Sequence, residues 1–223
     1  MVQCVNGIYA ITPNQSQDWS WPKIIECSQA VLNGGIRTLQ MRQKNLSVSA
    51  YQNKAFELAE LCQTYDALLI LNDPPENIEL KNWPGVAGVH VGRQDVTVSK
   101  ARSLWGHRLI VGASCYDRLD WAVQAVRDGA SYVAFGALFP SVTKPDAVQA
   151  SLSLFSQVAG LKVPKIGIGG VQLQHLPRLA QAGVDAVAVV SGLFGQTPQA
   201  KMAEMNAQQW VHAWEMAKKT VLG

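Results

Sequence analysis

The sequence predicts a closed (β/α)8 barrel, an α/β TIM barrel that forms a single domain over residues 1–223. Eight short apolar runs rich in β-forming residues recur along the chain, and stretches that fit a helix separate most of them. The runs are continuous rather than alternating in hydrophobicity, which is typical of parallel strands covered by helices. A doubly wound open sheet is the alternative, because the alternation of strands and helices does not prove that the sheet closes.

The expected strands coincide with the apolar runs, at residues 7–12, 38–44, 67–73, 87–92, 109–114, 132–139, 164–170 and 186–192. Helices are expected at residues 21–33, 49–65, 97–105, 117–128, 151–159, 173–182 and 198–219. The connection at residues 74–84 is too rich in proline to form a full helix. No low-complexity tract or linker indicates a second domain.

The composition excludes several classes of protein. With 48% hydrophobic and 16% charged residues, the chain can bury a large core and does not fit a disordered protein. Its net charge of +3 is too small, and too evenly spread, to indicate a nucleic-acid partner. The four scattered cysteines favour neither a zinc site nor a disulfide framework. The sequence shows no signal peptide and no apolar run of about 20 residues, so we expect a cytoplasmic protein without a membrane partner.

Polar side chains and glycines end most of the expected strands, which is where a barrel places its reactive groups. They are Arg42 and Lys44 on the second strand, Asn72 and Asp73 on the third, Asp95 after the fourth, Ser114 on the fifth, Ser141, Thr143 and Lys144 after the sixth, Gly169 and Gly170 on the seventh, and Ser191 on the eighth. Basic groups, carboxylates and glycine turns on one rim indicate a phosphorylated substrate and a divalent cation.

Each of these features also has a simpler structural explanation. Asp73 and Asp95 could ligate Mg²⁺, but they also fit a turn and a helix cap. Arg42 and Lys44 face the same side of a strand and suit a diphosphate, although solvated charges at a strand end explain them almost as well. His90 stands between two valines, where a hydrogen-bonded structural histidine is more common than a catalytic one.

Seven motifs in this order resemble those of the thiamine phosphate synthase family, and the resemblance covers about residues 7–195. The motifs are Gln40-Met41-Arg42-Gln43-Lys44, Asn72-Asp73, Gly88-x-His90-x-Gly92-x-x-Asp95, Gly112-x-Ser114, Pro140-Ser141-Val142-Thr143-Lys144, Gly167-x-Gly169-Gly170 and Val190-Ser191. Each motif is weak alone, but seven in order, each at the end of an expected strand, form a specific pattern.

The resemblance implies a transferase of thiamine biosynthesis. Such an enzyme joins 4-amino-2-methyl-5-pyrimidinylmethyl diphosphate to 4-methyl-5-(2-phosphoethyl)thiazole and releases thiamine phosphate and diphosphate. In the family, Mg²⁺ assists loss of diphosphate, and the thiazole nitrogen captures the pyrimidinylmethyl cation. No protein nucleophile is required, and the sequence offers no arrangement that would supply one.

The resemblance also implies roles for individual residues. Asp73 and Asp95 would bind Mg²⁺, and Arg42, Lys44, Ser114 and Lys144 would be catalytic. The pyrimidine diphosphate would be held by Gln40, Met41, Arg42, Gln43, Lys44, Asn72, Ser114 and Lys144. The thiazole phosphate would be held by Ser141, Val142, Thr143, Gly170, Val190 and Ser191.

Four residues depart from the family pattern, namely Gln43, Pro74, Tyr116 and Ala150. They leave open two alternatives, a thiazole tautomerase of the same fold and a non-catalytic regulator that binds thiazole phosphate. Such tautomerases use a histidine and lose the diphosphate and metal groups, whereas this chain keeps those groups and has Tyr116 in place of the histidine. Small molecules are therefore the expected partners, and a homodimer is compatible with the sequence.

Overall fold

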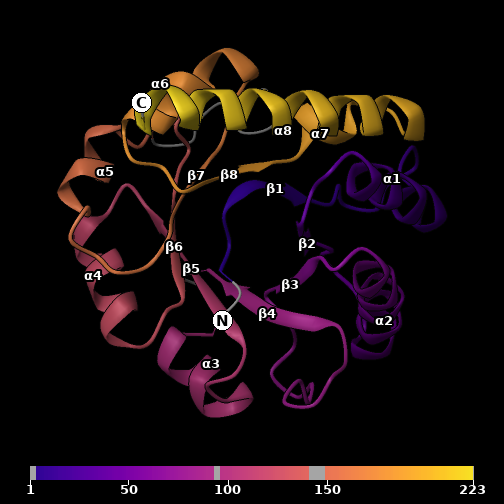
Figure 1. Ribbon diagram of the computed structural model, residues 1–223. Helices are drawn as coiled ribbons and strands as arrows, with labels where there is room; N and C mark the ends of the chain where they lie inside the picture. The colour runs from indigo at the N-terminus through magenta and orange to yellow at the C-terminus, as the bar shows by residue number, and fades with distance from the viewer. Residues whose placement is uncertain (1–3, 93–95, 141–148, 223) are drawn as a thin grey trace.

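Eight parallel strands close into a ring in the computed structural model, which describes residues 4–92, 96–140 and 149–222 (Figure 1). Each strand pairs with its neighbours in chain order, and β1 also pairs with β8 through Gly7–Ala186 and Ala10–Val189. This last pairing closes the barrel, so the predicted fold class is confirmed and the open sheet is excluded.

All eight expected strands are present. They are β1 (Gly7–Ile11), β2 (Thr38–Met41), β3 (Leu68–Asn72), β4 (Val86–Val91), β5 (Ile110–Tyr116), β6 (Tyr132–Phe135), β7 (Lys165–Ile168) and β8 (Ala186–Val189). Several end before the apolar run does, because the last residues of the run leave the barrel to form the loops of the carboxyl-terminal rim.

The helices lie outside the strands. They are α1 (Trp21–Asn33), α2 (Val48–Thr64), α3 (Val98–Trp105), α4 (Leu119–Arg127), α5 (Ser153–Gln157), the 3-10 turn η1 (Leu173–His175), α6 (Leu176–Gln181), α7 (Ser191–Phe194) and α8 (Ala200–Leu222). The proline-rich connection between β3 and β4 contains turns and no helix, as predicted. The four-residue helix α7 was not predicted, because so short a segment shows no helical period.

Side chains at alternating strand positions fill the barrel interior. Most are apolar, and they include Ile11, Leu68, Ile70, Ile110, Ala134, Ile166, Ala186 and Ala188. Tyr9 and Tyr132 lie among them, and the buried polar side chains of Gln40 and His90 lie nearer the carboxyl-terminal rim. A barrel interior of this kind is a packed core rather than a channel.

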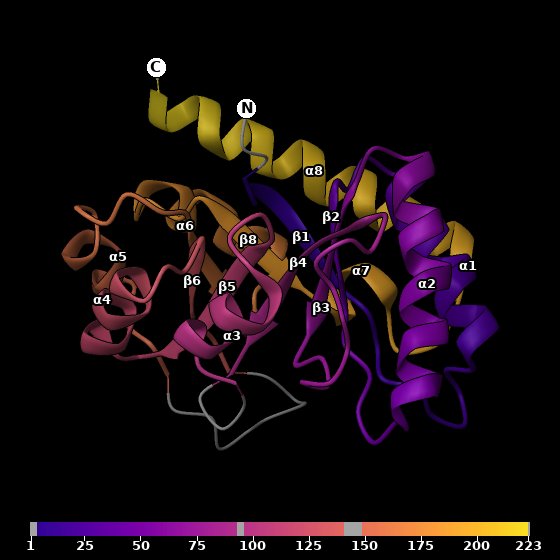
Figure 2. The ribbon, with the colours of Figure 1, turned by 90° about the horizontal axis from the view of Figure 1, so that it is seen from below.

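A second apolar layer lies between the strands and the helices. Figure 2 shows α1 and α2 on one side of the strands and α4 and α5 on the other. The last helix, α8, crosses the outside of the barrel and packs against α1, α6 and α7 (Figure 1). No helix in the described ranges is both long and apolar enough to cross a bilayer.

Arg102 of α3 ties together two connections at the amino-terminal end of the barrel, the one from α3 to β5 and the one from α4 to β6. Its guanidinium donates to the carbonyl oxygens of Gly129 at 2.9 Å, Gly106 at 3.2 Å and Leu109 at 2.6 Å. It also donates to Ser131 Oγ at 2.8 Å. The planar donor fork of arginine suits this set of acceptors, and a lysine cannot reach all of them.

Arg102→Lys is therefore expected to lower the free energy of unfolding by about 2–3 kcal/mol, because charged hydrogen bonds are lost at partly buried carbonyls. Urea unfolding followed by circular dichroism measures this change. Arg127→Lys, at an exposed position of α4, is the matched control and is expected to change it by less than about 0.5 kcal/mol. Equal stability of the two variants would contradict the role given to Arg102.

Candidate active site at the carboxyl-terminal rim

The structure brings the described site residues from β2, β3 and β5 to the same end of the barrel. Gln40 and Met41 lie on β2, Asn72 ends β3, and Ser114 lies near the end of β5. Five other predicted site residues, Asp95, Ser141, Val142, Thr143 and Lys144, lie outside the described residues.

The segment after β2 carries the two basic groups predicted to hold a diphosphate. Arg42 is partly buried, and its backbone N–H donates to Thr12 Oγ1 at 2.9 Å. The Asn14 amide, oriented so that both its bonds form, accepts from Arg42 Nη1 at 2.9 Å and donates to the Arg42 carbonyl at 3.0 Å. Lys44 is exposed. Arg42 is thus held in place from both sides, whereas Lys44 is a solvated charge at the rim.

Gln43, one of the departures from the family pattern, is buried, and its side chain holds the loop after β1. Its Nε2 donates to the Pro13 carbonyl at 2.6 Å, and its Oε1 accepts from Gln15 N at 2.8 Å. The sequence predicts that Gln43 binds substrate, and this stays a prediction; in the structure its amide nitrogen and oxygen each bond to the loop after β1. The glutamine keeps the loop of Asn14 beside Arg42.

Asn72 and Asp73 form a polar corner between β3 and β4. Asp73 Oδ1 accepts from the Gly92 N–H at 3.1 Å, and its Oδ2 accepts from Asn72 Nδ2 at 2.6 Å. The Asp73 N–H donates to the His90 carbonyl at 2.9 Å, and Tyr51 Oη donates to the Asn72 carbonyl at 3.0 Å. Asp73 has a left-handed φ of 43°, a conformation that Asp and Asn tolerate better than most residues. The backbone at this corner is bent so that the carboxylate is held at the rim.

The chemistry of this corner fits a magnesium ion. Mg²⁺ takes hard oxygen ligands, and it is usually bound by one or two carboxylates, with substrate phosphates and water as its other ligands. Asp73 is partly buried, and both its oxygens already accept a hydrogen bond that fixes their orientation. Among the described residues no cluster of three or more His, Cys, Asp or Glu side chains is present.

A row of hydrogen bonds crosses the barrel interior just below the rim. Gln40 Nε2 donates to Tyr9 Oη at 2.7 Å, and Tyr9 Oη lies 3.0 Å from Tyr132 Oη. His90 Nδ1 lies 2.8 Å from Tyr132 Oη, and its Nε2 lies 2.8 Å from Ser114 Oγ. Burial lowers the pKa of His90 to about 4 and raises that of Tyr9 and Tyr132, so all three are neutral at pH 7.

The sequence correctly predicted that His90 is a hydrogen-bonded histidine within a strand, but it gave no role to Tyr9 or Tyr132. Both tyrosines interrupt runs of aliphatic residues at inward positions. A tyrosine hydroxyl in an otherwise apolar strand is the sequence signal that indicates a buried hydrogen-bond partner.

The loops after β6 and β7 pack closely together. Leu138 N donates to the Ile168 carbonyl and Phe139 N to the Gly169 carbonyl, both at 3.0 Å. Gly170 has a φ of 63°, and a Cβ on it would overlap the carbonyl oxygens of Phe139 and Pro140. Only glycine allows this close approach to Phe139 and Pro140.

The loop after β8 is held by the last helix. Val190 and Ser191 are exposed at the rim, and α7 starts at Ser191. Trp210 Nε1 of α8 donates to the Gly192 carbonyl at 3.0 Å, and Asn206 Nδ2 donates to the Leu193 carbonyl at 3.1 Å. Loops after the seventh and eighth strands, with a short extra helix, bind phosphate in many barrels.

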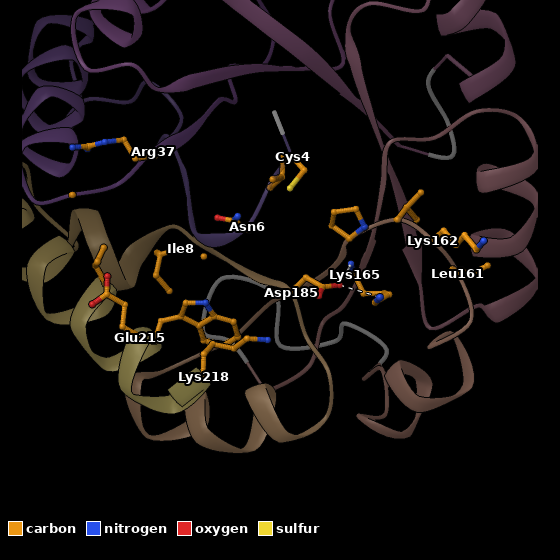
Figure 3. A pocket seen from close by; sticks show the side chains of 17 residues that line it. Cys4, Asn6, Ile8, Arg37, Leu161, Lys162, Lys165, Asp185, Glu215 and Lys218 are labelled. Atoms are coloured by element: carbon orange, nitrogen blue, oxygen red, sulfur yellow. Dashed lines mark hydrogen bonds and ion pairs between the residues drawn. The ribbon is translucent and has the colours of Figure 1, made fainter. Parts of the chain in front are cut away.

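A cavity of about 730 Å³ lies at the opposite end of the barrel (Figure 3). It opens beside the first residues of β1 and β7, and its lining includes Ile8, Lys165, Asp185 and Lys218. Lys165 Nζ and Asp185 Oδ2 form an ion pair there at 3.1 Å. Reactive groups in barrels gather at the carboxyl-terminal end, so this cavity is separate from the candidate site.

Comparison with known proteins identifies close relatives. The family profile described as thiamine monophosphate synthase matches residues 8–193. The chain is 44% identical over 190 residues to the thiamine-phosphate synthase of Chromobacterium violaceum, covering 85% of this chain and 89% of that protein. It is 40% identical over 205 residues to that of Thioalkalivibrio sulfidiphilus, covering 91% and 95%.

Solved structures agree with these relatives. A thiamine phosphate pyrophosphorylase from Pyrococcus furiosus superposes with a TM-score of 0.78 at 26% identity, covering 97% of both chains. A thiamine phosphate pyrophosphorylase from Bacteroides thetaiotaomicron, at 11% identity and a TM-score of 0.65, covers 95% of this chain and 98% of that one and shares the fold.

Proposed function

The chain belongs to the thiamine monophosphate synthase family, and from this premise we propose that it is a transferase that makes thiamine phosphate. It joins the pyrimidinylmethyl diphosphate to the thiazole phosphate and releases diphosphate. The observation that carries the proposal is the convergence of Gln40, Asn72, Asp73 and Ser114 at the same end of β2, β3 and β5. A phosphorylated substrate bound there meets amide, carboxylate and hydroxyl groups together.

The residues of the chain act by binding and positioning. Arg42, Lys44 and Lys144 counter the charge of the diphosphate, and Gln40, Asn72 and Ser114 hold the pyrimidine portion. Gly170, Val190, Ser191 and the segment Ser141–Thr143 hold the thiazole phosphate, so that its ring nitrogen faces the carbon that loses diphosphate. Because diphosphate leaves readily once its charge is countered, such positioning is enough and no covalent intermediate is needed.

The proposed resident ion is Mg²⁺, which Asp73 and Asp95 would hold, and when bound it would supply positive charge that stabilises the departing diphosphate. Asn72 and the Gly92 N–H fix the orientation of the Asp73 carboxylate, which supports its role as a ligand. We place the reaction in the cytoplasm, with small molecules as its substrates. The homodimer stays a prediction.

The direct test incubates the purified protein with both substrates and follows thiamine phosphate and diphosphate together, with Mg²⁺ and after chelation by EDTA. We expect equal amounts of the two products with Mg²⁺, and a fall of at least about 100-fold in rate after chelation. Restoring Mg²⁺ is the control for damage by the chelator.

Two other outcomes would each overturn the proposal. Isomerisation of the thiazole phosphate without coupling identifies the tautomerase. Tight binding of the thiazole phosphate with neither reaction identifies a non-catalytic regulator. Tyr116, which stands where the tautomerases have a histidine, is exposed and packs edge-on against Trp121, and it offers no imidazole for the first of these activities.

A further inference from the structure

We propose that Tyr9, Tyr132 and His90 are positioning residues, which form a directional hydrogen-bond chain that makes the Ser114 hydroxyl a donor toward the pyrimidine diphosphate. The chain starts at Gln40 and ends at Ser114, both residues assigned to the pyrimidine substrate. The inference rests on the proposed function for the identity of that substrate, but the direction of the chain is a property of the protein alone.

The direction follows from counting protons. The amide nitrogen of Gln40 has no lone pair to accept with, so it donates to Tyr9 Oη over their 2.7 Å contact. The 3.0 Å contact between Tyr9 Oη and Tyr132 Oη permits either hydroxyl as the donor. We assign the donation to Tyr9, because the opposite direction would leave its buried proton without an acceptor among the contacts described. Tyr132 in turn directs its own proton to His90 Nδ1 at 2.8 Å.

The state of His90 then determines the role of Ser114. Because Nδ1 accepts from Tyr132, a neutral His90 has its proton on Nε2 and donates it to Ser114 Oγ at 2.8 Å. Ser114 accepts this bond, and its own proton is left to point toward the rim. In the opposite tautomer the Ser114 hydroxyl would donate back to His90 and would be lost as a donor to the substrate.

The burial of the chain supports a fixed direction. Tyr9 and Tyr132 are each 1% exposed, and Gln40 and His90 are 3% and 8% exposed. Water therefore has little access to offer alternative partners, and each hydrogen bond depends on the next. The five side chains come from β1, β2, β4, β5 and β6, so the chain links strands across the barrel.

Gly112 gives the chain the room it needs. A Cβ on Gly112 would overlap the ring and hydroxyl of Tyr132, which stacks on His90 with ring centroids 5.6 Å apart. The glycine and the serine of the Gly112-x-Ser114 motif thus serve the same chain: one admits the tyrosine ring and the other receives the histidine bond. The family resemblance had assigned a role in substrate binding to Ser114 only and none to Gly112.

The test uses Tyr132→Phe, which removes one oxygen atom and leaves the ring. Without the tyrosine proton, His90 is free to move its own proton to Nδ1 and accept from Ser114. We expect kcat/KM for the pyrimidine diphosphate to fall about tenfold, with KM for the thiazole phosphate unchanged within about twofold. In a Ser114→Ala background the same substitution is expected to have no further effect, because the donor is already absent.

Tyr65→Phe is the matched control. It removes a hydroxyl whose contact with Asn33 Oδ1, at 2.7 Å, lies on the outside of the barrel, and it is expected to leave all rate constants unchanged. Additive losses in Tyr132→Phe and Ser114→Ala would overturn the proposal, since independent effects mean that Tyr132 does not act through Ser114.

Nitrogen NMR of ¹⁵N-histidine-labelled protein tests the direction without any activity. The His90 signals, assigned with His90→Gln, are expected to show the neutral Nε2–H tautomer in the wild type and in Tyr9→Phe, where Tyr132 still donates. A wild-type Nδ1–H tautomer would overturn the chain whatever the enzyme does. An inactive protein with the expected tautomer would instead contradict only the proposed function. The wild-type spectrum alone carries this test if Tyr132→Phe does not fold.

Discussion

Asp73→Asn is expected to lower kcat/KM by about 100- to 1,000-fold, the loss typical of removing one group that stabilises developing charge. The substitution keeps the size of the side chain and an oxygen for the Gly92 N–H, but it removes the charge that a cation requires. Asn also tolerates the left-handed backbone of this position. Steady-state rates over a range of Mg²⁺ concentrations measure the loss, and the apparent affinity for Mg²⁺ is expected to fall as well.

Asp66→Asn is the control for this experiment. Asp66 has a left-handed φ of 49°, close to the 43° of Asp73, but it is exposed and directly precedes Ala67 and β3 at the other end of the barrel. The same loss of charge, at a residue with the same backbone conformation but far from the site, is expected to leave activity unchanged. An Asp73→Asn enzyme with wild-type rates and Mg²⁺ dependence would exclude Asp73 as a ligand.

Gly170→Ala is expected to lower the free energy of unfolding by about 3 kcal/mol or more. A left-handed backbone alone costs an alanine about 1–2 kcal/mol, and at this site the new Cβ would also overlap two carbonyl oxygens. Either the loop after β6 moves or the barrel loses stability. In the folded fraction we therefore expect a higher KM for the thiazole phosphate, because Pro140 directly precedes the predicted phosphate segment. Urea unfolding and substrate titration measure the two effects.

Two other glycines separate the backbone cost of an alanine from the cost of its overlap with the carbonyl oxygens. Gly183 has a φ of 84° with open space around its Cβ position, so Gly183→Ala isolates the backbone cost of about 1–2 kcal/mol. Gly160 has open space and a φ outside the left-handed region, and Gly160→Ala is expected to change stability by less than about 0.5 kcal/mol. If Gly170→Ala and Gly183→Ala cost the same, the close packing of the two loops contributes nothing.

The sequence predicted the barrel well because each β/α unit repeats a strong local signal. It also predicted that polar groups gather at one rim, since every strand of a barrel ends on the same side. It could not assign Tyr9 and Tyr132, whose hydroxyls meet across 123 residues of chain. Such a contact leaves no periodic pattern in either strand. The side chain of Gln43 shows another limit, because its motif position indicated a substrate contact and gave no sign of the bonds that it makes to the loop after β1.

The placement of α8 has a consequence for when the protein can first work. In chain order α8 follows β8, so the loop after β8 is synthesised before the helix that holds it. Until α8 has folded against the barrel, Trp210 and Asn206 do not hold the carbonyls of Gly192 and Leu193. The loop predicted to bind phosphate is therefore fixed late in folding, and we expect substrate binding to follow the docking of this helix.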